Sequence, residues 1–217
     1  MKFTDTRGWM GKGKPLILID CGHGGMIDGK YTTAPSKMYD HGDFIFYEGV
    51  FNRELGIKVG YRLKNAEISY MFVTDSNEDV PLKTRVNMAN DIADMFRDKK
   101  TIYISLHGNA DGVESATGIE VYTSPGLTKS DKLATLIYYR LEELGWNMRE
   151  DLVDGDVDKE SRFYVLMKTV MPAVLIEAGF FTNKQEAMMM LDPDVQEMMA
   201  EKIVEGIKDY LRSENLY

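Results

Sequence analysis

The sequence has a single cysteine, Cys21, so no disulfide can form within the chain of 217 residues. This scarcity fits a reducing compartment, although one cysteine does not exclude export. Long hydrophobic runs are also missing, and no window approaches the roughly 20 apolar residues of a membrane-spanning helix. The opening stretch MKFTDTRGWMGKGKP lacks the apolar core of a signal peptide. We therefore expect synthesis in the cytoplasm and no insertion into a membrane.

Positive charge is in deficit too, since 26 lysines and arginines face 35 aspartates and glutamates, a formal net charge of −9. This balance argues against general nucleic-acid binding, which needs a basic surface, and against electrostatic docking on anionic membranes or wall polymers. No short-period repeat, low-complexity tract or Pro/Ser-rich linker interrupts the chain. We predict one catalytic domain over residues 1–217, with a core at about 15–212 and no separate wall-binding domain.

Strand-like and helix-like patterns alternate along most of the chain. The expected strands are 15–20, 68–73, 101–106, 118–123 and 173–177, and the expected helices are 48–64, 81–96, 130–144 and 193–211. Residues 24–47 show no periodicity and are expected to form a long loop, of the kind that is often functional. The alternation predicts an α/β fold, in which a twisted, mostly parallel mixed sheet is flanked by helices on both faces.

Three of the predicted strands end in polar residues that would meet at one edge of the sheet. His23 follows the first strand, His107 follows the third, and Glu177 closes the last. In open α/β sheets, ligands bind beyond the carboxyl ends of the strands. Taken singly, a histidine at a strand end is often structural, and Glu48 at a helix start favours the helix dipole without any function. Glu177 is different, because a buried carboxylate is costly unless it is paired or bound to a cation.

Two neutral imidazoles and one carboxylate, with water in the fourth position, are the ligand set of a catalytic zinc site. His23, His107 and Glu48 supply that set. Zinc lowers the pKa of its bound water to about 7. A further carboxylate must accept the proton of the water and pass it to the leaving group, and Glu177 is the candidate. The chain has no HExxH helix, so this site would be assembled from distant segments.

Five segments occur in an order typical of a known family: ILIDCGHGG, LKTRVNMAN, ISLHGNADG, GIEVYT and MPAVLIEAGFFTN. Together with Glu48 and the Asn52 that follows it, they resemble the zinc-dependent N-acetylmuramoyl-L-alanine amidases of the type-3 amidase group. The resemblance extends roughly from Leu16 to Leu211, which is nearly the whole chain.

This resemblance implies a zinc site formed by His23, Glu48 and His107, with Glu177 as the catalytic acid and base. It also implies a twisted sheet flanked by helices. The implied reaction is hydrolysis of the amide that joins the lactyl group of N-acetylmuramic acid to L-alanine of the stem peptide. Such a reaction serves lysis or remodelling of the cell wall.

The sequence departs from the family pattern near the first two ligands. Cys21 replaces the proline that usually precedes the first Gly-His pair, and its thiol is expected to turn into the core rather than to bind metal. The interval between His23 and Glu48 is longer than is usual in the family. The nearest alternative acids in the sequence are Glu54, Asp40 and Asp43. Arg85, on a predicted helix, is expected to have a structural role away from this edge.

Four further residues are candidates for supporting roles. Asn109 is expected to fix the loop after His107 or to contact a ligand. His41, in the long inserted stretch, is expected to be a loop or substrate-contacting residue rather than a metal ligand. Arg162 and Lys168 lie near the place where family members often have an arginine. Either could contact an anionic group of the substrate or remain a solvated surface charge.

Two other functions compete with the amidase interpretation: a zinc peptidase acting within the stem peptide, and a wall-binding module that has lost catalysis. We expect peptidoglycan muropeptides as the partner, no nucleic acid, and a monomer. Without a visible signal peptide, the protein is expected to reach the cell wall or periplasm by another route. A phage endolysin released through a holin fits this expectation, and an autolysin of the host is the alternative.

Overall fold

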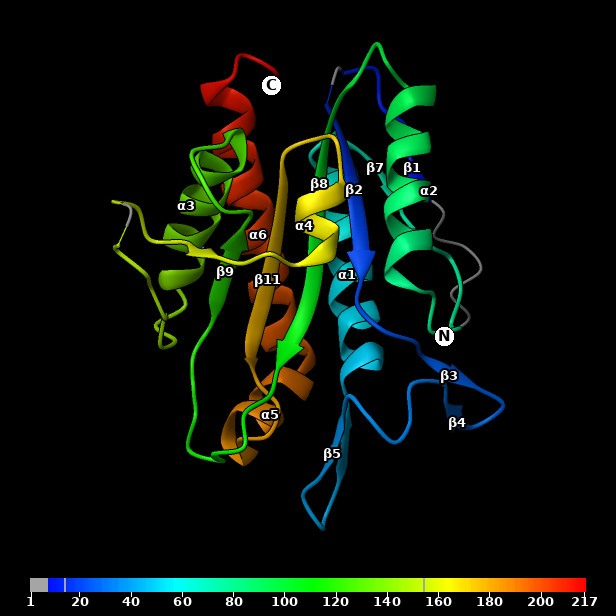
Figure 1. Ribbon diagram of the computed structural model, residues 1–217, viewed down its shortest axis with the longest axis vertical. Helices are drawn as coiled ribbons and strands as arrows, with labels where there is room; N and C mark the ends of the chain where they lie inside the picture. The colour runs from blue at the N-terminus through cyan, green and yellow to red at the C-terminus, as the bar shows by residue number, and fades with distance from the viewer. Residues whose placement is uncertain (1–7, 14, 154) are drawn as a thin grey trace.

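A seven-stranded mixed sheet forms the middle layer of the computed structural model, which describes residues 8–13, 15–153 and 155–217 (Figure 1). In spatial order its strands are β1 (Gly8–Trp9), β7 (Ser69–Phe72), β2 (Pro15–Cys21), β8 (Lys100–Asn109), β11 (Ala173–Phe180), β9 (Glu120–Thr123) and β10 (Lys159–Glu160). The strands β7, β2, β8 and β11 run parallel, whereas β1 and β9 are antiparallel to their inner neighbours. The predicted α/β fold with a mostly parallel mixed sheet is confirmed.

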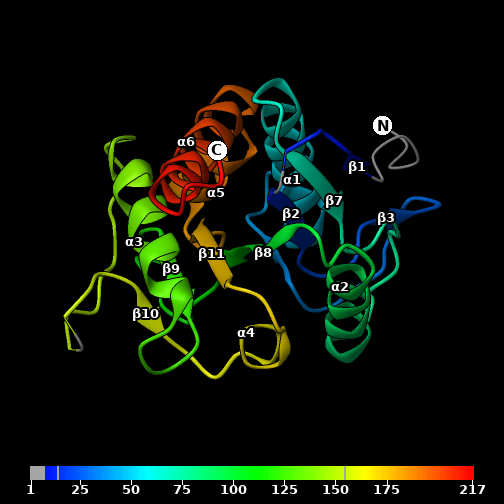
Figure 2. The ribbon, with the colours of Figure 1, turned by 90° about the horizontal axis from the view of Figure 1, so that it is seen from above.

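Helices cover both faces of the sheet, as predicted (Figure 2). One face carries α1 (Glu48–Asn65), α3 (Lys129–Glu142), α5 (Lys184–Leu191) and α6 (Pro193–Ser213), and the other carries α2 (Leu82–Met95) and α4 (Tyr164–Lys168). Strand β2 shows why two layers are needed. Ile17 and Ile19 belong to the core under α1, whereas Leu16 and Leu18 belong to the core under α2. A strand buried on both faces reads as a continuous apolar run, which explains the sequence LILI.

The inserted stretch 24–47 is not the structureless loop that we predicted. It contains two short antiparallel hairpins, β3 (Met26–Ile27) with β4 (Lys30–Tyr31), and β5 (Met38–Asp40) with β6 (Ile45–Tyr47). The first turns through Asp28 and Gly29, both at positive φ, and Asp-Gly is a common two-residue hairpin signal. The prediction was wrong because strands of two or three residues are too short to show a periodicity. Both hairpins lie beyond the carboxyl ends of the sheet strands (Figure 1).

The register of the sheet brings the predicted site residues to one edge. Cys21 pairs with Leu106 across β2 and β8, and His107 pairs with Glu177 across β8 and β11. Strand β8 runs on through Asn109, so His107 lies within the strand rather than after it. Among the described residues, none of the helices combines the length and the apolar character that crossing a bilayer requires.

Candidate metal centre

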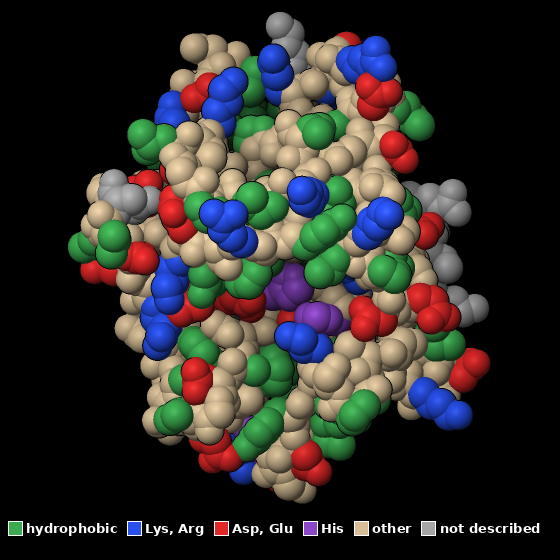
Figure 3. Space-filling model, viewed as in Figure 1, with side chains coloured by type: hydrophobic (Ala, Val, Ile, Leu, Met, Phe, Trp, Pro, Cys, Tyr) green, Lys and Arg blue, Asp and Glu red, His purple; other side chains and the backbone are tan. Residues whose placement is uncertain are grey.

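Three side chains from distant segments meet at the carboxyl edge of the sheet. Nε2 of His23 lies 3.3 Å from Glu48 Oε1, and Nδ1 of His107 lies 3.0 Å from the same oxygen. One possible ligand atom from each residue lies within 4.8 Å of the others. In the part of the chain that the structure describes, this is the one group of three or more such side chains able to share a metal ion. Figure 3 shows histidine side chains at the bottom of a hollow in this face.

The chain carrying His23 is held in an unusual conformation. His23 has φ of 62°, in the left-handed region that non-glycine residues occupy at a cost of about 1–3 kcal/mol. Its carbonyl oxygen accepts hydrogen bonds from Nη2 of Arg53 and Nη2 of Arg85, each at 2.8 Å. At Gly22, a Cβ atom would lie 2.2 Å from Cε1 of His107. The Gly-His pair therefore lets the two imidazoles approach each other across the strand ends.

We expected Arg85 to lie away from this edge, and that prediction was wrong. Its side chain anchors the loop that carries His23. Its Nη1 donates to Asp20 Oδ1 at 2.7 Å and to the Cys21 carbonyl at 2.6 Å. Burial opposes ionisation of Asp20, but the Arg85 guanidinium and the Tyr103 hydroxyl outweigh it and lower the pKa of this carboxyl. The expectation failed because residue spacing along a helix does not show which loop a long side chain reaches.

Replacing Arg85 by methionine is expected to lower the free energy of unfolding by about 3–5 kcal/mol, since it leaves the Asp20 charge buried and unpaired. The pKa of Asp20 is lowered on folding, so the stability it contributes is present above its unfolded pKa and is lost as the pH falls. The deficit of the variant should therefore shrink below about pH 4. Urea denaturation from pH 3 to 8 measures it. Arg97→Met, at a side chain 77% exposed, is the control, and an equal loss there would contradict the prediction.

Glu48 is the first residue of α1 and is fully buried. Burial alone would raise the pKa of its carboxyl, but hydrogen bonds and charge from His107 and His23 lower it to about 2. Oε2 is buried without a hydrogen bond and lies 3.9 Å from Nζ of Lys37. One turn later, Asn52 Nδ2 donates to the Gly22 carbonyl at 3.0 Å. This donor set of two imidazoles and one carboxylate with a free oxygen fits a divalent transition metal.

The alternative acids lie elsewhere. Glu54 accepts a hydrogen bond from Gln196 on the outer side of α1, and Asp43 pairs with Lys184 at 2.9 Å. Asp40 accepts from the backbone N–H of Gly42 within the β5–β6 hairpin. None of the three acids belongs to the group that could hold a metal in the described residues.

Glu177 lies beside the three candidate ligands without joining them. Its Oε2 is buried and has no hydrogen-bond partner. Burial raises the pKa of Glu177 to about 7, and His107 opposes this effect while the Glu48 carboxylate adds to it. A carboxyl group that titrates near neutral pH, next to a possible metal site, is suited to accept and return a proton.

In the metal-free protein, Glu177→Gln is expected to raise the melting temperature, Tm, at pH 8 but not at pH 4. The pKa of Glu177 is raised on folding, so its contribution to stability is complete below about pH 4.5 and is lost as the pH rises through about 7. Glutamine does not titrate, so the difference between variant and parent should grow across that range. Calorimetry after removal of metal with a chelator measures it, and a constant difference from pH 4 to 8 would disprove the pKa assignment.

Cys21 and His41 lie outside the metal-binding group. The Cys21 side chain is buried in the core under α1, and burial raises the pKa of its thiol to about 12, as expected of a core residue. The His41 ring packs between Tyr39 and Phe44, tilted against both, with ring centroids 4.7 Å apart on each side. Its Nε2 lies 3.0 Å from the Phe181 carbonyl oxygen, so it ties the β5–β6 hairpin to the end of β11.

Sequence reasoning missed a charged cluster beside Glu177. Glu120 pairs in register with Glu177 across β9 and β11 and is buried. Its two oxygens accept hydrogen bonds from Asn109, Tyr122, Arg149 and Lys159. Asn109 thus fixes the chain after His107 through Glu120, whereas Arg162 and Lys168 are exposed near α4. In the sequence, the one sign of this cluster was Glu120, an acid within the apolar strand GIEVYT.

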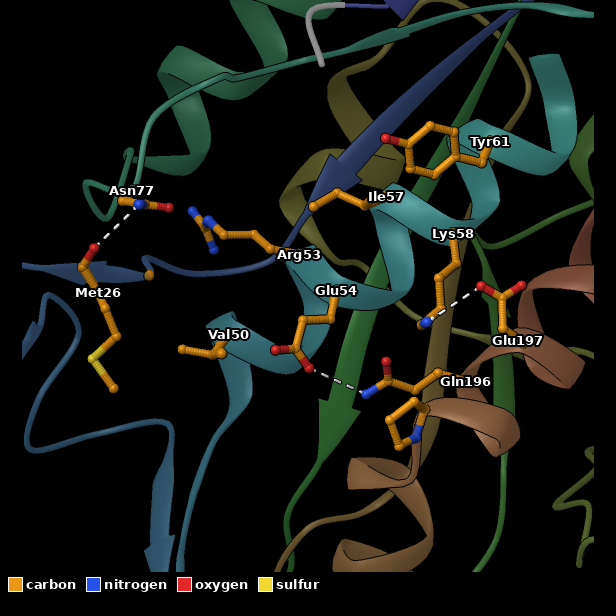
Figure 4. A pocket seen from close by; sticks show the side chains of 12 residues that line it. Met26, Val50, Arg53, Glu54, Ile57, Lys58, Tyr61, Asn77, Gln196 and Glu197 are labelled. Carbon is orange, nitrogen blue, oxygen red and sulfur yellow. Dashed lines mark hydrogen bonds and ion pairs between the residues drawn. The ribbon is translucent and has the colours of Figure 1, made fainter. Parts of the chain in front are cut away.

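A pocket of about 610 Å³ lies on the outer side of α1 (Figure 4). Four of its polar side chains form two pairs: Gln196 Nε2 donates to Glu54 at 3.3 Å, and Lys58 Nζ lies 3.3 Å from Glu197 Oε1. None of the three candidate metal ligands lines it. The histidine hollow of Figure 3, rather than this pocket, is the candidate active site.

The chain is similar in sequence to known proteins. A family profile described as N-acetylmuramoyl-L-alanine amidase matches residues 17–209. The probable cell wall amidase LytH of Staphylococcus epidermidis is 27% identical over 205 residues, which cover 93% of this chain and 60% of LytH. The chain thus spans about 60% of the length of these curated relatives.

Two solved structures are similar over almost their whole length. The N-acetylmuramoyl-L-alanine amidase from Clostridium difficile 630 gives a TM-score of 0.74 at 27% identity, covering 94% of this chain and 100% of that one. The catalytic domain of CwlV, an N-acetylmuramoyl-L-alanine amidase from Bacillus (Paenibacillus) polymyxa var. colistinus, gives 0.71 at 26% identity, covering 91% and 98%.

Proposed function

This chain belongs to the N-acetylmuramoyl-L-alanine amidase family, and from that membership we propose that it is a zinc-dependent hydrolase of peptidoglycan. The bond cleaved is the amide between N-acetylmuramic acid and L-alanine of the stem peptide. His23, Glu48 and His107 hold the zinc ion, and Glu177 is the catalytic acid and base. The single observation that carries the proposal is the meeting of two imidazole nitrogens and one carboxylate within 4.8 Å, beside the unpaired carboxyl of Glu177.

The donor set supports zinc rather than Ca²⁺ or Mg²⁺. Imidazole with a carboxylate suits zinc, whereas Ca²⁺ and Mg²⁺ prefer sites made of oxygen alone. When bound, zinc would supply a Lewis acid that polarises the scissile carbonyl and makes the attacking water more acidic. Asn52 and the Arg53–Arg85 pair hold the ligand-bearing segments in place through Gly22 and His23.

Glu177 moves the proton. As the water attacks the carbonyl carbon, the carboxylate accepts a proton at Oε2, which has no competing hydrogen bond in the protein. The same oxygen then delivers the proton to the amide nitrogen, so that the stem peptide leaves as a neutral amine. Lys37, whose ammonium lies 3.9 Å from Glu48 Oε2, faces this hollow and can contact a carbonyl or carboxylate of the substrate.

The site of action is proposed to be the cell wall, since the similar LytH is a probable cell wall amidase. Access through a holin and a monomeric state stay predictions from the sequence, and gel filtration would test the second. The supporting and substrate-contacting roles of His41, Arg162 and Lys168 also stay predictions.

Mass spectrometry of the soluble products from purified sacculi tests the proposal. Free stem peptides that begin at L-alanine, with lactyl groups intact on the glycan, are expected. Cleavage inside the stem peptide would replace the amidase by a peptidase with the same metal centre. Bound zinc with no product would instead indicate a wall-binding module.

A further inference from the structure

A pair of aspartates lies apart from the zinc site, at the far edge of the sheet. Asp158 immediately precedes β10, which pairs with the end of β9, and Asp156 lies two residues before Asp158. Asp158 is only 1% exposed, and its Oδ2 accepts a hydrogen bond from Thr123 Oγ1 at 2.7 Å. Its Oδ1 and the Oδ1 of Asp156 are both buried without a hydrogen-bond donor. Two carboxyl oxygens are therefore withdrawn from water and have no partner other than the opposite carboxyl group.

The two carboxyl groups lie within hydrogen-bonding reach of each other. Burial raises the pKa of Asp158 to about 8. The Thr123 hydrogen bond lowers this pKa, whereas Asp156 and Asp131 raise it further. Asp131 brings a further negative charge near the pair, and its own oxygens accept hydrogen bonds from the backbone and hydroxyl of Thr128 at the start of α3. In the described part of the chain, neither Asp156 nor Asp158 has an ion pair with a lysine or arginine. Without a cation, the pair must either retain a proton or keep two like charges buried at a cost in stability.

We propose that Asp156 and Asp158 form a second metal site, which binds a Ca²⁺ ion. A cation between the two Oδ1 atoms would satisfy both oxygens at once. The donors are carboxylate oxygens alone, which suit hard cations rather than zinc. Ca²⁺ accepts irregular geometry and completes its shell with carbonyls and water, whereas Mg²⁺ demands a near-octahedral site.

The printed sequence supports a cation loop. Residues 154–158 read DGDVD, with an acid at every second position. Acids at alternating positions also supply the first ligands of the EF-hand calcium loop. Asp154 lies outside the described residues, and the site proposed here stands on Asp156 and Asp158.

The ion would hold β10 against β9. Lys159 follows Asp158 directly, pairs with Tyr122 in the β9–β10 register, and donates to Glu120 Oε1 at 2.8 Å. Glu120 in turn lies opposite Glu177. Ca²⁺ is therefore expected to stabilise the edge of the sheet beside the zinc site while taking no part in the chemistry.

Calorimetric titration of the zinc-loaded protein with CaCl₂, followed by thermal melting, tests the site. We expect one Ca²⁺ per chain and a rise in Tm of about 3–6 °C at a Ca²⁺ concentration ten times Kd. Asp156→Asn and Asp158→Asn should abolish both effects. The new amide can donate to the remaining carboxylate, so without Ca²⁺ these variants should melt no lower than the parent at pH 8. Asp98→Asn, which removes an exposed charge between α2 and β8, should keep the full response.

Several results would overturn the proposal. Absence of Ca²⁺ binding by the parent would leave a carboxyl–carboxylate pair that shares a proton. A response that persists in Asp158→Asn would place the ion elsewhere, and a response to MgCl₂ without one to CaCl₂ would reject the assigned ion. Because binding and melting are measured without substrate, none of these outcomes depends on the proposed amidase activity.

Discussion

Glu177→Gln is expected to lower kcat on purified peptidoglycan by about 10²–10⁴-fold, the usual contribution of a general acid–base group. Glutamine has nearly the same shape but cannot take the proton of the water or return it to the leaving nitrogen. The candidate ligands His23, Glu48 and His107 are untouched, so the zinc content should stay at one per chain. Release of stem peptides under substrate saturation measures kcat, and elemental analysis measures zinc.

The matched control for Glu177 is Glu142→Gln, which removes the charge of an exposed glutamate in the last turn of α3. It should retain full activity. A Glu177→Gln enzyme that works at the parental rate would remove Glu177 from the mechanism. Loss of zinc together with activity would show that Glu177 belongs to the metal site instead.

Replacing His23 or His107 by alanine is expected to weaken zinc binding by more than about 100-fold, beyond the 10–100-fold typical of residues that only support a ligand. Each change removes one of three protein ligands and leaves the Glu48 carboxylate buried with fewer partners. Competition with a chromophoric chelator measures the affinity. Activity should disappear at zinc concentrations that saturate the parent.

The chain has only three histidines, so His41→Ala completes the series. The ring of His41 packs against Tyr39 and Phe44 in the β5–β6 hairpin, so this variant should bind zinc as the parent does. A loss of zinc affinity as large in His41→Ala as in His23→Ala would mean that the ligand set has been assigned wrongly.

The amino-acid sequence by itself determined the layers of this protein and the edge at which its chemistry is placed. The run LILI predicts a strand covered on both faces, and the structure buries all of β2. Polar residues that end such apolar strands must emerge at the carboxyl edge of a parallel sheet. His107 and Glu177 therefore meet in register, and the family motifs predict the chemistry of that edge from the sequence alone.

Only the tertiary structure decided which acid faces the histidines and what supports them. Glu48, Glu54 and Asp43 are all near one another in sequence, but the start of α1 turns Glu48 inward and leaves the others outside. Arg85 reaches from α2 to the loop of His23. The sequence pattern indicates only which residues of a helix or strand are buried. The direction of a long side chain across an element boundary depends on packing between segments far apart in the chain.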